Sequence, residues 1–384
     1  MQRIYMDHSA TTPVDTAVLE AMLPYFCEKF GNASSVHQFG QEARAAVEEA
    51  REKVAHLINA KESEIVFLSG GTEADNYAIQ GVGMALRERG NHIITSKIEH
   101  HAVLQTCEVL EKNGFSVTYL DPDPYGMIHP EMVAAAITPR TILVSIMHAN
   151  NEIGTINPIS KIGSITRERG ILFHTDAVQS FGKLPIDMEN MNIDLLSASS
   201  HKIYGPKGVG IIFIGRGTKI DKLIHGGAHE HNRRAGTENV AGIVGFGKAV
   251  EICENVMKDE GRRLTALRHY FWQKLQESMT GVYLNGHPTE RLPGSLNLSF
   301  AGVEGESLLL SLDMKGIAAS SGSACSSGSN MPSHVLAALH LPPERLHGSL
   351  RFSLGRSNTE ENIDYAISAL KEIVERLRAM APTT

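Results

Sequence analysis

The sequence contains few cysteines, and none of them lie close together. No Cys-x-x-Cys pair occurs, so neither a structural zinc site nor a disulfide scaffold is expected. Three of the cysteines lie in apolar stretches with helical spacing, and we expect them to fill the core. The four cysteines are Cys27, Cys107, Cys253 and Cys325.

The chain also lacks a basic block, a membrane span and a signal peptide. Lys and Arg number 36 against 43 Asp and Glu, so nucleic acid is not an expected partner. Apolar runs such as 209–214 are far too short to cross a membrane, and no apolar core follows the first residues. These features favour a soluble cytoplasmic enzyme.

The 384 residues are 42% hydrophobic and 21% charged, which is typical of a globular protein with two domains. Apolar runs of strand length alternate with helical patterns through the first two thirds. Because such runs are buried on both faces, they predict an α/β fold with a mainly parallel sheet of the seven-stranded type. The predicted strands are 64–68, 92–95, 117–120, 141–146, 171–174, 195–198 and 209–213.

After about residue 239 the pattern changes. A long helical stretch runs to 278, with a predicted interruption near 258–261. The segments 296–300 and 350–354 alternate apolar and polar residues, which predicts strands with one face exposed. We therefore expect a large domain at 14–255 and a smaller α+β domain built from 1–13 and 256–384.

Polar residues follow several of the predicted strands. Gly71 and Thr72 open a helix directly after a strand, where backbone N–H groups can bind an anion, although a turn there can need glycine for geometry alone. Asp176 ends a buried strand, at the sheet edge where ligands of α/β proteins bind. The alternative for Asp176 is a helix N-cap.

Lys202 follows another predicted strand, in a turn of small residues. A lysine that is desolvated there can act as a Schiff-base amine, although most single lysines are simply exposed. An anion anchor, a carboxylate and an amine at strand ends are together what a pyridoxal 5'-phosphate site requires.

The string Ser-His-Lys-Ile-Tyr-Gly-Pro-Lys-Gly at 200–208 resembles the lysine motif of cysteine desulfurases of the NifS/IscS type, which have the class V aminotransferase fold. The resemblance extends over nearly the whole chain. It implies a large domain that binds pyridoxal 5'-phosphate and a smaller α+β domain, as in aspartate aminotransferase-like enzymes. Further matching segments are 7–13, 71–73, 99–100, 150–154, 234–239 and 321–325.

The resemblance implies roles for individual residues. Lys202 would bind the cofactor covalently and act in catalysis, Asp176 would pair with the ring nitrogen, and His100 would stack on the ring as a second catalytic residue. Arg351 would bind the substrate carboxylate. The cofactor-binding residues implied are Gly71, Thr72, His100, Asn151, Asp176, Gln179, Ser199, Ser200, His201, Lys202 and Thr237, of which Asn151 would also contact the substrate.

Within that set, Gln179 would bond the phenolic oxygen of the ring. The phosphate would be held by Gly71, Thr72, Ser199 and His201, with Ser200 beside them. Thr237 would reach the phosphate of the neighbouring subunit, which implies a homodimer.

Cys325 lies in a stretch of small polar residues, and this composition predicts a mobile surface loop at about 320–332. Composition alone leaves open that the cysteine is incidental. The resemblance implies that Cys325 takes the sulfur of L-cysteine as a persulfide and leaves L-alanine. A sulfur-acceptor protein or an iron-sulfur scaffold would then receive the sulfur, for cluster assembly or thiolation.

Other functions remain possible at this point: a selenocysteine lyase, another class V aminotransferase, or a non-catalytic sulfur carrier. His225, His229 and His231 cluster near Glu230, but glycines interrupt the segment and no intrinsic metal is expected. The resemblance leaves at most a transient contact of the Cys325 persulfide with an iron-sulfur cluster. The sequence does not identify the sulfur acceptor.

Overall fold

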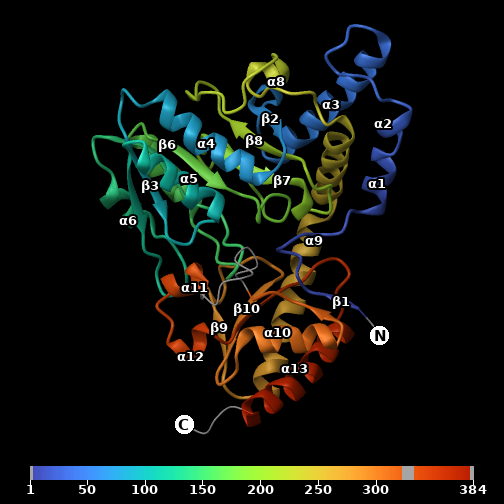
Figure 1. Cartoon of the computed structure of the whole chain (residues 1–384), viewed down its shortest axis with the longest axis vertical. Coiled ribbons are helices and arrows are strands. Elements are labelled where there is room, and N and C mark those ends of the chain that lie inside the picture. The colour runs from blue at the N-terminus through green and yellow to red at the C-terminus, as the bar shows by residue number, and fades with distance from the viewer. Residues whose placement is uncertain (1–2, 322–332, 381–384) are drawn as a thin grey trace.

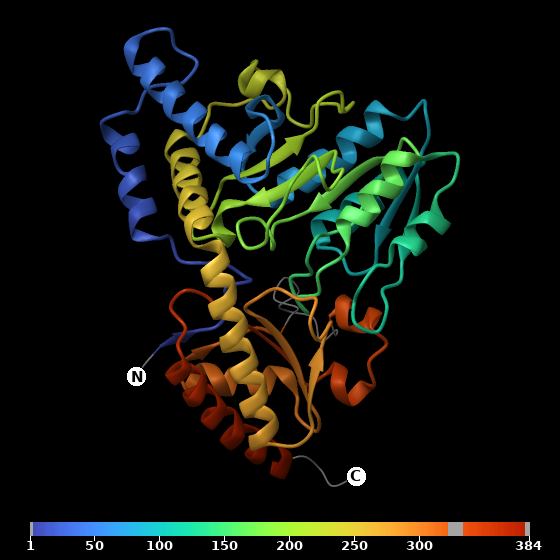
Figure 2. The same cartoon turned by 180° about the vertical axis from the view of Figure 1, so that it is seen from behind.

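The computed structural model describes residues 3–321 and 333–380. In this part of the chain, two lobes are joined by one long helix (Figures 1 and 2). The described residues form sheets of seven, three and two strands. The seven-stranded sheet lies in the first lobe and the other two lie in the second.

The large sheet has the strand order β2-β8-β7-β6-β5-β3-β4, and all neighbours are parallel except β8, which is antiparallel to both β2 and β7. The prediction of a mainly parallel α/β sheet is confirmed. Its strands are β2 (Ile65–Leu68), β3 (His92–Ser96), β4 (Ser116–Leu120), β5 (Thr141–Ser145), β6 (Leu172–Asp176), β7 (Leu195–Ser199) and β8 (Gly210–Ile214).

Both faces of this sheet are covered. Ile65 and Phe67 of β2 belong to one buried apolar cluster, whereas Val66 and Leu68 belong to another on the opposite face. Because successive side chains of a strand point to opposite faces, each face has its own core. The helices of this lobe are α1 (Thr16–Met22), α2 (Pro24–Cys27), α3 (Gln38–Leu57), α4 (Gly71–Ala85), α5 (His101–Lys112), α6 (Pro130–Ala136), α7 (Ile159–Glu168) and α8 (His229–Asn232), with short 3-10 turns η1 (Glu62–Glu64) and η2 (Ser200–Lys202).

The long helix α9 (Val240–Ser278) passes from the first lobe into the second (Figure 2). It runs unbroken, so the predicted interruption near 258–261 is wrong. A single glycine, Gly261, costs a helix only about 1 kcal/mol, and no proline accompanies it. Phe246 packs in the first lobe and Phe271 in the second, so packing at both ends stabilises the helix. The predicted domain boundary at 255 falls within α9 and stays a prediction.

The second lobe is built around the small antiparallel sheet β12-β10-β9. Its apolar face packs against α9 and the last helix, α13. The elements of this lobe are β1 (Ile4–Tyr5), β9 (Val282–Asn285), β10 (Ser295–Phe300), α10 (Gly305–Met314), β11 (Ile317–Ala318), α11 (His334–Ala338), α12 (Pro343–Leu346), β12 (Ser349–Ser353) and α13 (Glu360–Met380).

The prediction that β10 and β12 expose one face is wrong, because both strands are buried along their whole length. Their polar face is covered by the segment that follows β5. Asn297 Nδ2 donates to the Glu152 carbonyl over 3.2 Å, and Arg351 Nη1 donates to the Asn151 carbonyl over 2.9 Å. The polar face of the small sheet therefore faces the other lobe rather than solvent.

The cysteines divide into two groups. Cys107 and Cys253 are buried, as predicted, but Cys27 is exposed. It ends the four-residue helix α2, whose neighbours Phe26 and Phe30 are exposed as well, so this segment lies on the surface. Cys325 and most of the predicted loop at 320–332 lie outside the described residues. Among the described helices, none is both long and apolar enough to cross a bilayer.

Candidate active site

The carboxyl ends of the central strands bring several predicted residues to one edge of the large sheet. Asp176 is the last residue of β6 and Ser199 is the last residue of β7, and these two strands are parallel neighbours. β2 also runs in this direction, because it is antiparallel to β8, which is itself antiparallel to β7. The turn that begins at Gly71 therefore lies at the same edge.

Lys202 follows β7 in the turn η2. Its Nζ donates to the carbonyls of Ser9 and Ala10 over 2.6 and 2.7 Å. Burial, and after it the positive charges of Lys183 and Arg351, lower the pKa of Lys202 to about 7. A large part of the amine is therefore neutral near pH 7, the form in which it can act as a nucleophile or base.

Gln179 shares a contact with Lys202. Its Nε2 also donates to the Ser9 carbonyl, over 2.9 Å. Its Oε1 is buried and has no hydrogen-bond partner among the described residues. Since an unpaired buried oxygen is costly, this atom is available to a ligand.

The charges of Asp176 and His100 each affect the pKa of the other residue. Burial raises the pKa of Asp176, while His100 and Lys202 oppose that rise. Asp176 Oδ1 also accepts the backbone N–H of Val178 over 2.9 Å, so the capping contact considered from the sequence is present as well. His100 caps α5, because its Nδ1 accepts the backbone N–H of Ala102 over 3.1 Å. Burial lowers the pKa of His100, which keeps the ring neutral with its proton on Nε2.

The first residue of α4, Gly71, has no room for a side chain. A Cβ on Gly71 would lie 2.6 Å from Val178 Cγ2 and 3.7 Å from Ser199 Cβ. The start of α4 can therefore approach a ligand closely with its backbone N–H groups, next to Ser199. Thr72, the second residue of this helix, is exposed.

Ser200 and His201, the two residues before Lys202, differ in their contacts. Ser200 Oγ packs against Gly205 and has no hydrogen-bond partner among the described residues. His201 Nδ1 is 3.1 Å from Thr11 Oγ1. Burial lowers the pKa of His201 to about 4, so this imidazole is neutral.

Arg351 reaches the site from the middle of β12. It is 3% exposed, and its Nη2 donates to Asp7 Oδ1 over 2.7 Å. The positive charge of Arg351 lowers the pKa of Lys202, so the two side chains lie close enough to interact electrostatically. Asn151, for which we predicted contact with the cofactor and the substrate, accepts from Arg351 Nη1 through its backbone carbonyl.

The structure brings together residues from both lobes, but not all the predicted ones. Thr237 is exposed on the segment between α8 and α9. Sequence reasoning assigned no roles to Asp7, Ser9 and Lys183. Ser9 acts through a carbonyl, for which no side-chain signal exists, but Asp7 and Ser9 both belong to the segment 7–13 that carried the resemblance.

Comparisons with known proteins show the family to which this chain belongs. Residues 4–366 match the class-V aminotransferase family. The chain belongs to this family. Its enzymes generally use pyridoxal 5'-phosphate, and the resemblance found in the sequence is confirmed.

Curated relatives are similar over nearly the full length. A cysteine desulfurase IscS of Dictyoglomus turgidum is 55% identical over 99% of this chain and 97% of the relative. A cysteine desulfurase IscS of Methanosarcina thermophila is also 55% identical, over 99% of this chain and 94% of the relative. Among solved structures, a NifS-like protein superposes with a TM-score of 0.92 at 38% identity and covers 98% of this chain and 100% of that one. The structure of SspA in complex with cysteine gives a TM-score of 0.80 at 39% identity, over 92% of this chain and 99% of that one.

Proposed function

We propose that this protein is a pyridoxal-phosphate-dependent cysteine desulfurase that converts L-cysteine to L-alanine and passes the sulfur to an acceptor. One observation carries the proposal: Lys202, with a pKa of about 7, lies at the sheet edge within electrostatic reach of Asp176 and Arg351. The amine, the carboxylate and the guanidinium are the groups that an amino-acid substrate and a pyridine cofactor require. The full-length similarity to cysteine desulfurases supports the same reaction.

The residues present fit the cofactor. Among the described residues, no cationic side chain hydrogen-bonds to Asp176, so this carboxylate suits a protonated ring nitrogen. The turn at Gly71, which a Cβ would fill, suits a phosphate, and the unpaired Gln179 Oε1 suits a ring substituent. We assign Thr72, Ser199 and His201 to the phosphate and His100 to the face of the ring. When bound, pyridoxal phosphate draws electron density from Cα of the amino acid, which makes its sulfur transferable.

Within this site, each protein group has a defined task. Lys202 holds the cofactor and, as a neutral amine, removes and returns the Cα proton. Asp176 keeps a negative charge at the ring nitrogen. Arg351 binds the substrate carboxylate with a planar pair of N–H donors, which fixes the orientation of the substrate.

Cys325 is the proposed sulfur acceptor on the basis of its motif, since it lies outside the described residues. Its thiolate attacks the sulfur of the bound cysteine. The Cβ–Sγ bond of the substrate breaks, Cys325 becomes a persulfide, and protonation of the remaining carbon skeleton gives alanine. An acceptor protein or an iron-sulfur scaffold then removes the outer sulfur. The cytoplasmic location predicted from the sequence stays a prediction.

A homodimer is part of the proposal. Side chains of α1, α2 and the start of α3 form an exposed apolar surface in this single chain: Leu19, Leu23, Phe26, Phe30, Val36 and Phe39. Exposed patches of this kind are typical of protein interfaces. Ala33 and Ser34, which lie between Phe30 and Val36 in the chain, line one hollow together with Glu238, so the segment that carries exposed Thr237 lies beside this surface. A second copy that packs here would receive Thr237 close to the interface.

The test replaces Cys325 by serine. The holoenzyme of Cys325→Ser should keep its cofactor absorbance but produce no alanine from L-cysteine, because a hydroxyl cannot accept the sulfur. Cys107→Ala, which alters a buried cysteine of α5 outside the proposed dimer surface, should still produce alanine. Full turnover by Cys325→Ser would exclude the persulfide route. A keto acid product would indicate an aminotransferase, and turnover of selenocysteine alone would indicate a selenocysteine lyase.

A further inference from the structure

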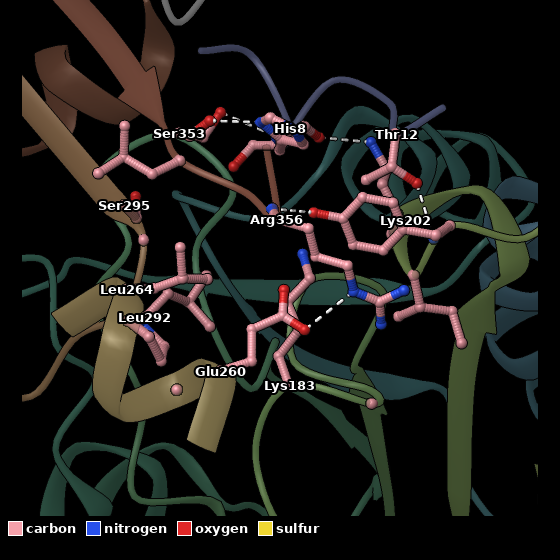
Figure 3. A pocket seen from close by; sticks show the side chains of 18 of the residues that line it. His8, Thr12, Lys183, Lys202, Glu260, Leu264, Leu292, Ser295, Ser353 and Arg356 are labelled. Atoms are coloured by element: carbon pink, nitrogen blue, oxygen red, sulfur yellow. Dashed lines mark hydrogen bonds and ion pairs between the residues drawn. The ribbon is translucent and has the colours of Figure 1, made fainter. Parts of the chain in front are cut away.

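The N-terminal segment 7–12 connects the small sheet to the turn that follows β7. At its start, its backbone pairs with Ser353, the last residue of β12. At its end, the Thr12 N–H donates to the His201 carbonyl over 2.9 Å. Ser353, Thr12 and Lys202 all line one pocket (Figure 3). This segment therefore lies beside the proposed active site and contacts both of the elements that supply its cations.

Asp7 brings a carboxylate from this segment to Arg351. Its Oδ1 accepts from Arg351 Nη2 over 2.7 Å, and the side chains of Asp7 and Arg351 are 17% and 3% exposed. Hydrogen bonds between charged groups are shorter and stronger than those between neutral groups. The chain thus supplies a carboxylate of its own to the guanidinium that is proposed to bind the carboxylate of the substrate.

Arg351 has further contacts that hold it in place without Asp7. Its Nη1 donates to the Asn151 carbonyl over 2.9 Å, and its backbone pairs with Asn297 in β10 and with Ser320. Its Nε is buried and has no hydrogen-bond partner among the described residues. Loss of the Asp7 charge therefore leaves the guanidinium in position, with more of its N–H groups available to a ligand.

We propose that Asp7 competes with the substrate carboxylate for Arg351 and thereby controls how tightly amino acids bind, an inference that rests on the proposed function of Arg351. A ligand carboxylate that reaches this guanidinium shares it with Asp7, and the two negative charges repel each other. Without Asp7, a buried cation lacks its counter-charge, so an incoming carboxylate gains more by binding.

This competition affects the product as well as the substrate. L-Cysteine and L-alanine carry the same carboxylate, so stronger binding at Arg351 would retain both. Binding that is equally strong for substrate and transition state lowers KM without raising kcat. Asp7 therefore acts through Arg351 as a positioning residue, and its charge favours the release of alanine.

The test titrates the holoenzyme with L-alanine by isothermal calorimetry and measures KM for L-cysteine in parallel. Asp7→Asn keeps the shape of the side chain but removes its charge. Its dissociation constant for L-alanine and its KM should both fall by about tenfold, as one charged hydrogen bond predicts, while kcat should not rise. Asp7→Ala removes the same charge and should act in the same direction. A residue that only supported Arg351 would instead weaken binding when altered.

Two controls show whether the charge of Asp7 is responsible. Asp7→Glu keeps the charge and should bind L-alanine more weakly than Asp7→Asn does. Asp15→Asn alters another Asp–Arg pair, in which Asp15 Oδ2 lies 3.1 Å from Arg356 Nη1. Because asparagine still caps α1 as Asp15 does, this variant should bind L-alanine like wild type.

A double variant shows whether Asp7 acts through Arg351. In an Arg351→Met background, Asp7→Asn should tighten L-alanine binding much less than in wild type, because only direct repulsion is removed. Circular dichroism checks that each variant is folded. Unchanged or weaker binding by folded Asp7→Asn or Asp7→Ala, or equal tightening with and without Arg351, would overturn the proposal. Failure of wild type to form alanine from L-cysteine would instead count against the proposed function.

Discussion

The large and the small sheet present polar residues in opposite ways. In the large sheet each face packs into an apolar core, and Asp176 and Ser199 stand at the strand ends. In the small sheet Arg351 stands in the middle of β12, on a polar face that the other lobe covers. An alternating strand can therefore mark a face buried against a second lobe rather than a face in water.

The difference assigns separate tasks to the two lobes. The ends of parallel strands meet at one edge, so the large sheet gathers groups around the cofactor. The small sheet contributes a side chain from the flank, close to where a substrate carboxylate would lie. Substitutions in the two sheets should therefore affect different kinetic constants.

The largest effect is expected at the end of the large sheet. Lys202→Ala removes both the covalent attachment and the proton-transferring amine. The visible absorbance band that reports covalent attachment of the cofactor should disappear. The rate of alanine formation should fall by about 10²- to 10⁴-fold, the usual contribution of a positioned proton carrier. The matched control is Lys161→Ala on the surface, and equal behaviour of the two variants would contradict the assignment.

A smaller effect, of a different kind, is expected in the small sheet. Arg351→Met removes the proposed carboxylate contact but leaves Lys202 in place. KM for L-cysteine should rise by about 10- to 100-fold, as loss of a charged hydrogen bond predicts, with the cofactor band intact. Arg345 also donates within the second lobe, to Asn285 Oδ1 over 2.8 Å, and Arg345→Met serves as the control. If both variants raise KM equally, the proposal that Arg351 binds the substrate carboxylate is contradicted.

The sequence could predict the elements of the large sheet, because continuous apolar runs bounded by turns are strong strand signals. It could also predict Asp176 and Lys202, which follow such runs. The sequence could not predict that the other lobe covers Arg351. Alternating apolar and polar residues show that a strand has two different faces, but not what packs on each face. The sequence also could not predict that Lys183, from the turn after β6, lowers the pKa of Lys202, because such an interaction depends on how the two turns lie in the fold.

The smallest effect on activity is expected at Glu99, a buried residue between β3 and α5. Burial raises the pKa of Glu99 from 4.5 to about 8. Between these two pH values the folded protein keeps a proton on Glu99 that the unfolded chain has already released. Folding stability should therefore fall as the pH rises from about 4.5 to about 8. Urea unfolding across this range should show a weaker pH dependence for Glu99→Gln than for wild type. Glu108→Gln, an exposed change on α5, should leave the slope unchanged.

The most direct measurement mixes the purified holoenzyme with L-cysteine in the absence of any acceptor and follows two quantities together: alanine released, and the mass of the peptide that contains Cys325. The account predicts one alanine for each subunit, matched by one additional sulfur atom on Cys325. Alanine release with no sulfur on Cys325, or sulfur on Cys27, Cys107 or Cys253 instead, would contradict it.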